Sequence, residues 1–234
     1  MTRKTMNNEI LLLTDDLALS QGLIQDLKDH ECHIQSDQIA HHLQQDLSQV
    51  EPFLIILLDI HQSLSMSFEL MDQIRQFIHI NIIVLSPSQE EQDCLDAFSH
   101  GADDYIKKPI LLAELVARIK AVERRTHATP MDDATLSHGS LFLNCLTRQA
   151  LLEDQILILT NSEFNVLELF LRYPGRVLSK EQLTEYSLGR KYTAFDRSID
   201  VHISNLRQKL NEDHHDESWI KTIRGYGYAF VAKG

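Results

Sequence analysis

The chain has 234 residues, a formal net charge of −12 and a hydrophobic content of 43%. This length suits two domains of about 100–130 residues each, and the apolar fraction is ordinary for proteins with real cores. The acidity excludes a protein that binds nucleic acid through uniform positive charge. The charge is unevenly distributed, however, because residues 1–135 contain 10 basic and 22 acidic residues, whereas residues 136–234 contain 12 of each. The second half can therefore present a basic face.

The cysteines and the apolar runs indicate the compartment. Cys32, Cys94 and Cys145 are odd in number, far apart and outside any Cys-x-x-Cys pairing, which favours free thiols over a zinc site. The apolar run at 10–13 is too short for a signal peptide, and no segment approaches the roughly 18 apolar residues of a membrane helix. We expect a soluble cytoplasmic protein with no membrane partner.

Apolar runs alternate with amphipathic segments through the first half. The runs at 10–13, 53–58 and 80–85 predict strands buried on both faces. Apolar residues at helical spacing between and after these runs predict helices, with stripes at Leu19, Leu23 and Leu27, at Ile39, Leu43 and Leu47, and at Leu112, Leu115, Ile119 and Val122. This alternation predicts an α/β fold with a doubly wound parallel sheet.

Polar residues stand at the expected carboxyl ends of these strands. They are Asp15 with Asp16 or Thr14, then Asp59, Ser86 and Lys108. Strand-end polar residues are common in loops, but four groups in this order favour a site, because ligands gather at that edge of an open sheet. Clustered carboxylates favour Mg²⁺, and Asp59 could then accept a phosphoryl group whose oxygens a hydroxyl and an ammonium would hold.

The segment Gly-Ala-Asp-Asp-Tyr-x-x-Lys-Pro at 101–109 is specific enough to indicate a family. Residues 9–126 resemble the receiver domain of bacterial two-component response regulators, which implies a five-stranded flavodoxin-like sheet. The resemblance implies that Asp59 is the phospho-acceptor, Asp15 a metal ligand, Ser86 and Lys108 the switch hydroxyl and lysine, and Tyr105 the aromatic switch. It also implies that phosphorylation shifts the protein towards a dimer. Residues available for charge pairs on the dimer face are Asp103, Asp104, Glu114, Arg118 and Arg125, with solvated surface charge as the alternative.

The chain departs from the receiver pattern at three places. An alignment without gaps puts Thr14 and Asp15 where two acidic residues are usual, whereas a one-residue shift puts Asp15 and Asp16 there. The loop after Asp59 reads Ile-His-Gln-Ser, with serine where glycine is expected at 67, and Cys94 replaces a basic residue. These departures leave open a phosphorylation-independent DNA-binding regulator with a degenerate receiver.

Two further alternatives are weaker. An aspartyl-phosphate phosphatase often needs a second Asp two positions after its nucleophile, but that position holds His61, so we predict no enzyme. The pairs at 41–42 and 214–215 are histidines without further ligands, which favours surface residues over metal sites.

A change in composition separates the two halves. Residues 127–139 are small and polar, contain one proline and lack apolar periodicity, which predicts a flexible linker. The expected domains are residues 1–126 and 140–234.

The second half predicts a small α+β domain. Short apolar patterns at 141–144, 149–152 and 156–159 predict strands, and Thr160-x-x-Glu163 and Ser179-x-x-Gln182 predict capping boxes that open two helices. A third helix is expected from about 196 to 210, followed by a β-hairpin around Gly-Tyr-Gly at 225–227. Three helices and a hairpin predict a winged helix-turn-helix.

Hydrogen-bonding and cationic residues lie away from the apolar stripe of the third helix and on the hairpin. Such groups reach phosphates and base edges in a DNA groove, although a solvated helix face has a similar composition. The candidates are Arg197, Ser198, His202, Asn205, Arg207 and Lys209 on the helix and Thr222, Arg224 and Tyr228 on the hairpin.

Residues 140–234 are similar to the effector domain of OmpR/PhoB-type regulators. The similarity rests on Thr-x-x-Glu-Phe at 160–164, on Asp-Arg-Ser-Ile-Asp-Val-His-Ile from 196, and on Ile-Arg-Gly-x-Gly-Tyr at 223–228. It implies that Ser198 and Asn205 read bases. It also implies contacts to the DNA backbone or the minor groove from Arg197, His202, Arg207, Thr222, Arg224 and Tyr228. The two resemblances together imply a sensor histidine kinase as phosphodonor, Mg²⁺ as cofactor, a homodimer on activation and promoter DNA as target, with RNA polymerase as a further candidate partner.

Overall fold

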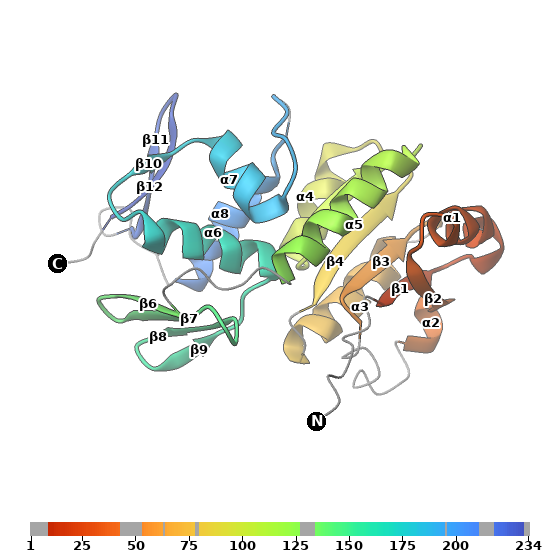
Figure 1. Cartoon of the computed structure of the whole chain (residues 1–234), viewed down its shortest axis with the longest axis horizontal. Helices are drawn as coiled ribbons and strands as arrows, with labels where there is room; N and C mark the ends of the chain where they lie inside the picture. Colours follow the sequence, from red (N-terminus) through yellow and green to blue (C-terminus); the bar gives the residue numbers. More distant parts are fainter. Residues whose placement is uncertain are drawn as a thin grey trace. The chain divides into compact units, whose positions relative to one another are not determined.

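The computed structural model describes residues 9–42, 53–62, 64–77, 80–126, 134–194, 196–210 and 218–231. The chain divides into two compact units, Met1–Thr126 and His127–Gly234 (Figure 1). No helix in the described ranges is long and apolar enough to cross a membrane.

The first unit is a five-stranded parallel sheet with helices on both faces, as predicted. The strand order is β2-β1-β3-β4-β5. The strands are β1 (Glu9–Thr14), β2 (His33–Gln38), β3 (Ile55–Asp59), β4 (Asn81–Ser86) and β5 (Asp104–Lys107). The helices are α1 (Leu17–Asp29), α2 (Ile39–His42), α3 (Leu64–Phe77), α4 (Glu91–Ser99) and α5 (Leu112–Thr126).

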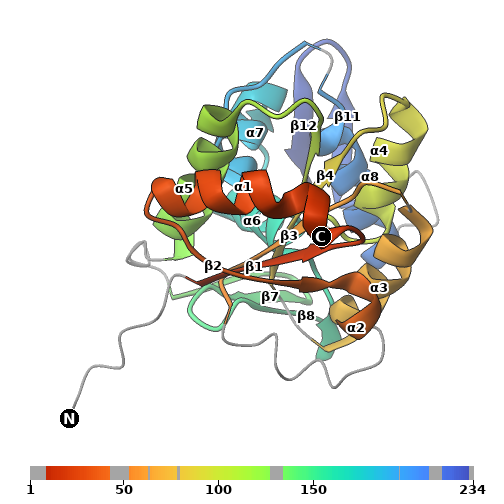
Figure 2. The ribbon, with the colours of Figure 1, turned by 90° about the vertical axis from the view of Figure 1, so that its right-hand side faces the viewer.

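The central strand β3 is buried along its whole length, because helices cover both faces of the sheet. Helices α1 and α5 lie together on one face, and α2, α3 and α4 lie on the other (Figure 2). Ile24 and Leu27 of α1 and Leu115 and Ile119 of α5 join one hydrophobic cluster with alternate residues of the strands. In the parallel register Thr14 lies opposite Asp59, so the strand ends carry their polar groups to one edge.

The predicted stripe of α1 is wrong at Leu19 and correct at Leu27, and Leu23 is partly buried against the hydrophobic cluster. Leu19 is 62% exposed, and the buried residues of this helix are Ser20, Ile24 and Leu27. The i, i+4, i+7 spacing of these three residues is that of a single helix face. Ser20, which the predicted stripe did not include, therefore carries its hydroxyl into the interior. The stripe predicted from Ile39 is described only to His42, since Leu43 and Leu47 lie outside the described residues.

The second unit contains three helices, a four-stranded antiparallel sheet and a three-stranded sheet that includes the predicted hairpin. The helices are α6 (Asn161–Arg172), α7 (Lys180–Leu188) and α8 (Ser198–Lys209). The four-stranded sheet has the order β6 (Thr135–His138), β7 (Leu141–Asn144), β8 (Gln149–Leu152) and β9 (Gln155–Leu157). The other sheet has the order β10 (Val177–Leu178), β12 (Gly227–Phe230) and β11 (Ile220–Ile223).

The later part of the predicted linker belongs to this unit. Residues Thr135–His138 form β6, which pairs with β7 along its whole length, so sheet pairing overrides a composition typical of a tether. The earlier part, 127–133, lies outside the described residues.

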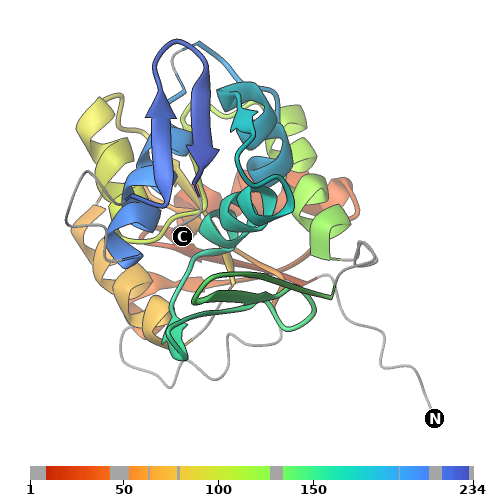
Figure 3. The same cartoon turned by 90° about the vertical axis from the view of Figure 1, so that its left-hand side faces the viewer.

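Helix α6 is the centre of the second unit and contacts both α7 and α8 (Figure 3). Thr160 and Ser179 cap α6 and α7 with the predicted capping boxes. The rings of Trp219 and Phe230 stack with centroids 5.5 Å apart and close the core beneath the hairpin.

Gly227 begins β12 with a φ of +145°, and a Cβ atom there would lie 2.0 Å from the carbonyl oxygen of Leu178. The hairpin therefore approaches the strand before α7 as closely as backbones allow.

Candidate functional site

Asp59 ends β3, and its side chain is the centre of a polar cluster in the first unit. The residue is only 1% exposed. Its Oδ1 lies 2.7 Å from Lys108 Nζ, and its Oδ2 lies 2.6 Å from Ser20 Oγ and 3.2 Å from His61 Nε2. A buried carboxylate is expensive unless it is paired and hydrogen-bonded, and these three groups provide that compensation.

Lys108 follows β5 and reaches across the edge of the sheet. Its Nζ also donates to the carbonyl oxygen of Ile60 at 2.7 Å, and its backbone N–H donates to the Ser86 carbonyl at 2.8 Å. The ammonium is therefore fixed beside Asp59, where it can hold oxygens of a transferred anionic group.

Asp15 and Asp16 play different parts, although they are adjacent. Asp15 accepts the backbone N–H groups of His61 and Gln62 at 2.8 and 2.7 Å, which holds the loop after Asp59. Asp16 is the N-cap of α1 and accepts two backbone N–H groups of the first turn. The strand end thus directs one carboxylate, that of Asp15, towards the loop beside Asp59.

The donor set fits Mg²⁺ only as a two-carboxylate site. Hard carboxylate oxygens from Asp15 and Asp59 suit this ion, which is often held through one or two carboxylates and keeps several waters. All four oxygens already contact donors, and no three His, Cys, Asp or Glu side chains in the described parts of the chain are grouped to hold a metal. Because Asp16 caps a helix, we leave it out of the predicted ligand set.

Ser86 and Tyr105 are both buried near this edge. Ser86 is 0% exposed and accepts the backbone N–H of Ser88 at 3.2 Å. The hydroxyl of Tyr105 is buried and forms no hydrogen bond of normal geometry with the described residues, although Ser86 lies close enough for a weak one. Burial raises the pKa of Tyr105. Such an unsatisfied hydroxyl is poorly held in place and suits a side chain that changes position.

The predicted charge pairs of the dimer face form within the chain. Arg118 is paired with Asp104 and with Glu114, which lies one helical turn earlier. Asp103 is buried and accepts from Arg75 and from the backbone N–H of Ile82, so it stabilises the fold. The side chain of Arg125 lies outside the described residues.

In the second unit, α8 turns one face inward and another outward. Ile199, Ile203 and Leu206 are buried in the core. His202 is 0% exposed and Ser198 is 2% exposed, so we leave both side chains out of the DNA-contacting surface that their sequence positions predict. Ser198 instead donates to Asp196 at 2.6 Å at the start of the helix.

Arg190 fixes that helix start by pairing with Asp196. Burial opposes ionisation of Asp196, but the hydrogen bonds and the charge of Arg190 hold its pKa below the usual range.

Two predicted DNA-contacting cations are already bound within the domain. Arg207 donates to the Ile220 carbonyl at 3.0 and 2.7 Å and to Thr222 Oγ1 at 2.9 Å, which links α8 to β11. Lys209 donates to the buried Glu163 at 2.6 Å. Their first role is therefore to hold the helix against the hairpin and the core.

Asp200, which the sequence analysis did not select, links three elements. It accepts from Lys180 of α7 at 2.7 Å and from the Tyr228 hydroxyl of β12 at 2.7 Å. Burial and the neighbouring Asp200 carboxylate raise the pKa of Tyr228. Hydrogen bonds of Arg207 and Asp200 thus link α8 to the hairpin at two places.

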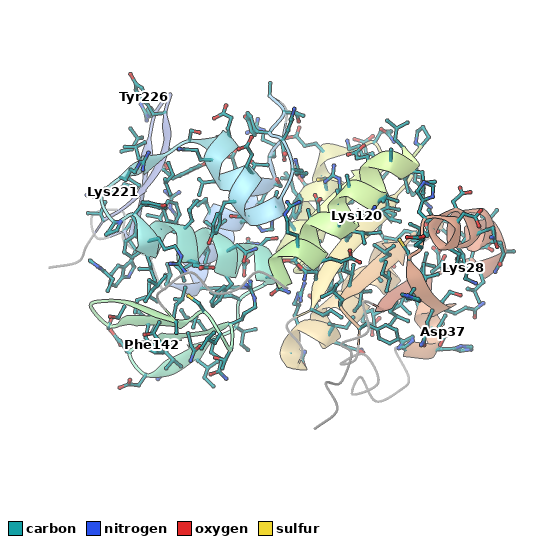
Figure 4. The ribbon with its side chains drawn as sticks, in the orientation of Figure 1. Lys28, Asp37, Lys120, Phe142, Lys221 and Tyr226 are labelled. Atoms are coloured by element: carbon teal, nitrogen blue, oxygen red, sulfur yellow. The ribbon has the colours of Figure 1, made fainter. Side chains whose placement is uncertain are left out.

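The outward surface consists of one helix face and the hairpin. Arg197, Thr222 and Arg224 are exposed, and Asn205 is half-buried. Lys221 and Tyr226 of the hairpin also point outward (Figure 4). A cavity of about 440 Å³ lies beside the turn of the hairpin, with Lys180, Tyr192, Arg224 and Tyr226 among its lining residues.

Several residues near Asp59 and on the outward face of α8 were not predicted from the sequence. Ser20 shows a usable signal, because it is a small polar residue at i, i+4, i+7 spacing with Ile24 and Leu27. Ser204 and Gln208 lie on the exposed face of α8, opposite the stripe of Ile199, Ile203 and Leu206, and the same periodicity would have found them. Only the structure shows the contact of His61 with Asp59.

Comparison with known proteins matches both units to described families. Residues 10–120 match the response regulator receiver domain, and residues 153–230 match the C-terminal domain of transcriptional regulatory proteins. The transcriptional regulatory protein CpxR of Klebsiella pneumoniae subsp. pneumoniae is 37% identical over 232 residues, which cover 96% of this chain and 99% of that protein. CpxR of Escherichia coli is 36% identical with the same coverage.

The sequence runs 188–190, 195–200 and 202–207 predict similarity to CpxR-type regulators, which these identities confirm. A solved structure of a RitR mutant is 24% identical, covers 97% of this chain and 100% of that chain, and has a TM-score of 0.69. At this identity the likeness shows the fold alone.

Proposed function

Because the chain belongs to the OmpR/PhoB-type response regulators, in which a receiver domain is joined to a DNA-binding domain, we propose that Asp59 accepts a phosphoryl group from a sensor histidine kinase. The observation that carries this proposal is the buried Asp59 carboxylate at the end of β3, with Lys108 Nζ 2.7 Å away. A carboxylate beside a fixed ammonium has both the nucleophile and the charge that phosphoryl transfer needs.

In the transfer, an Asp59 oxygen forms a bond to phosphorus while the bond from phosphorus to the donor imidazole breaks. The imidazole keeps that electron pair. Lys108 holds the transferred oxygens, and Ser86, buried at the neighbouring strand end, supplies a hydroxyl to them. A bound Mg²⁺ would neutralise charge on the carboxylates and the phosphoryl group, and Asp15 and Asp59 are the residues that would hold it.

The phosphorylated receiver then forms a homodimer through the surface of α4, β5 and α5. The chemistry that supports this surface is the cluster of Asp104, Glu114 and Arg118, whose pairs within one chain can be exchanged for pairs between chains. Dimerisation raises the effective concentration of the second DNA-binding unit, so two weak half-site contacts can act together.

Helix α8 enters the major groove of promoter DNA, and the hairpin contacts the adjacent backbone or minor groove. Arg197, Asn205, Thr222 and Arg224 make the contacts, and Lys180 and Arg224 at the hairpin cavity attract a backbone phosphate. We propose that the protein acts in the cytoplasm, with RNA polymerase as a further partner at the promoter.

The test is incubation of the full chain with a small phosphodonor and Mg²⁺, read by intact mass and by sedimentation. We expect a gain of one phosphoryl group that Asp59→Ala abolishes, together with dimerisation and tighter binding of promoter DNA. A second candidate function, DNA binding independent of phosphorylation, is favoured by the neutral Thr14 and by the donors that occupy both Asp59 oxygens. It would be established if no mass is gained while promoter DNA is still bound.

A further inference from the structure

Of the polar contacts that the described residues make with the Asp59 carboxylate, that of Ser20 is the shortest, and the proposed reaction gives this residue no role. The residue is 0% exposed on α1, and its Oγ lies 2.6 Å from Asp59 Oδ2. The same Oγ lies 2.9 Å from Thr14 Oγ1 and 3.1 Å from the Asp16 carbonyl oxygen.

A hydroxyl has one proton, so Ser20 can donate fully to one of these acceptors at a time. The Asp59 carboxylate is both the nearest and the charged acceptor, and hydrogen bonds to ionised acceptors are the stronger ones. Thr14 Oγ1 accepts the backbone N–H of Asp16 at 3.1 Å and lies 2.9 Å from Ser20 Oγ and 3.3 Å from the Asp16 carbonyl oxygen. When Ser20 donates to Asp59, Ser20 Oγ is the nearer of the two acceptors for the Thr14 proton. A chain of donors therefore runs from the start of α1 through Thr14 and Ser20 to Asp59.

These hydrogen bonds occupy Asp59 Oδ2, which a cation would need as a ligand. Lys108 holds Asp59 Oδ1, while Ser20 and His61 contact Oδ2. The carbonyl oxygen of Asp16 gives the Ser20 proton a second acceptor 3.1 Å away. The hydroxyl can therefore leave Asp59 without becoming unsatisfied, so it has two usable positions.

We propose that Ser20, supported by Thr14, competes with a divalent cation for Asp59 Oδ2. Its hydroxyl occupies this oxygen until the cation displaces it. This inference rests on the proposed function for its biological meaning, but the competition itself is a binding property. Thr14 thus has two effects: it is neutral where a carboxylate is usual, and it strengthens the hydrogen bond from Ser20 that competes with the cation for Asp59. Ser20 is a positioning residue here.

The test measures Mg²⁺ binding to the full chain by titration calorimetry, without any phosphodonor. Removal of a hydrogen bond to a carboxylate by Ser20→Ala should tighten Mg²⁺ binding by about tenfold. Thr14→Val, which keeps the size of the side chain, should tighten binding by a smaller factor. Ser67→Ala is the matched control, because Ser67 is also 0% exposed in the same unit and is not among the contacts of Asp59.

Binding heat that survives Asp59→Asn belongs to other acidic groups and is subtracted. Unchanged or weaker Mg²⁺ binding in Ser20→Ala would overturn the inference. If circular dichroism shows that Ser20→Ala does not fold, Thr14→Val decides the matter, because equal affinity in this variant and the wild type also overturns it. The mass measurement on Asp59 separately tests the proposed function, so the failure of one is distinguishable from that of the other.

Discussion

Replacement of Arg207 by alanine separates two roles that a cation of the third helix can have. In the structure its guanidinium donates to the Ile220 carbonyl and to Thr222, and it lies over the Tyr228 ring at 5.8 Å. If these contacts are its main role, Arg207→Ala should lower the stability of the DNA-binding unit. If its main role is a DNA phosphate contact, the variant should mainly change the salt dependence of binding.

The magnitude follows from the hydrogen bonds. A charged donor to a carbonyl contributes about 1.5–3 kcal/mol, so we expect a loss of about 2 kcal/mol. For a unit of about 100 residues, this loss corresponds to a decrease in Tm of about 10 °C. DNA affinity should fall at every salt concentration, because the hairpin loses one of its two links to α8.

Thermal unfolding and the salt dependence of DNA binding are the assays. Arg224→Ala is the matched control, since Arg224 is an exposed cation of the same hairpin. It should leave Tm unchanged and reduce the slope of log affinity against log salt by about one. An Arg207→Ala protein that keeps the wild-type Tm and shows the same loss of slope as Arg224→Ala would refute the assignment of Arg207 as a link.

Three further predictions test other parts of the molecule. Lys108→Ala should slow phosphoryl gain at Asp59 by about 100-fold, as measured by intact mass over time, because it removes the fixed positive charge; equal rates would contradict the role of Lys108. Tyr105→Phe should stabilise the receiver by about 1 kcal/mol in denaturant unfolding, because it removes a buried hydroxyl that lacks a hydrogen-bond partner in the described residues; a destabilised variant would show that the hydroxyl is satisfied. The lowered pKa of Asp196 contributes stability that is present above the usual carboxyl pKa of about 3.9 and is lost as the pH falls through the folded-state pKa. Asp196→Asn should therefore weaken this acid dependence in the DNA-binding unit, and an unchanged profile would count against the Arg190 pair.

The buried strands could be predicted because they are continuous apolar runs, and the two capping boxes because their spacing is specific. Strand β2 could not be predicted in this way. Its residues His33–Gln38 are mostly polar, with Ile34 half-buried, since an edge strand buries little of its surface. Strand β6 was hidden for a similar reason: its exposed and half-buried residues alternate in a segment with the composition of a linker.

Around Asp59, the residues at strand ends could be predicted, including the neutral Ser86, whereas Ser20 and His61 could not. Asp59 and Lys108 stand at strand ends, which the pattern locates directly. Ser20 lies on the inward face of α1, where the predicted stripe instead put the exposed Leu19. On the DNA-binding side, sequence pattern identifies Arg207 as a cation but cannot show that its hydrogen bonds are used within the domain, because that depends on the packing of a hairpin 13 residues away.

The close approach of Gly227 to Leu178 has a consequence for screens of this protein. A Cβ atom at 227 would meet the Leu178 carbonyl at 2.0 Å, so any other residue must push the hairpin away from the start of α7. A substitution there would abolish operator recognition although the residue supplies no side chain to DNA. Maps of lost function would therefore mark this position among the DNA-contacting ones, and designers who exchange α8 or the hairpin to retarget the protein must retain this glycine.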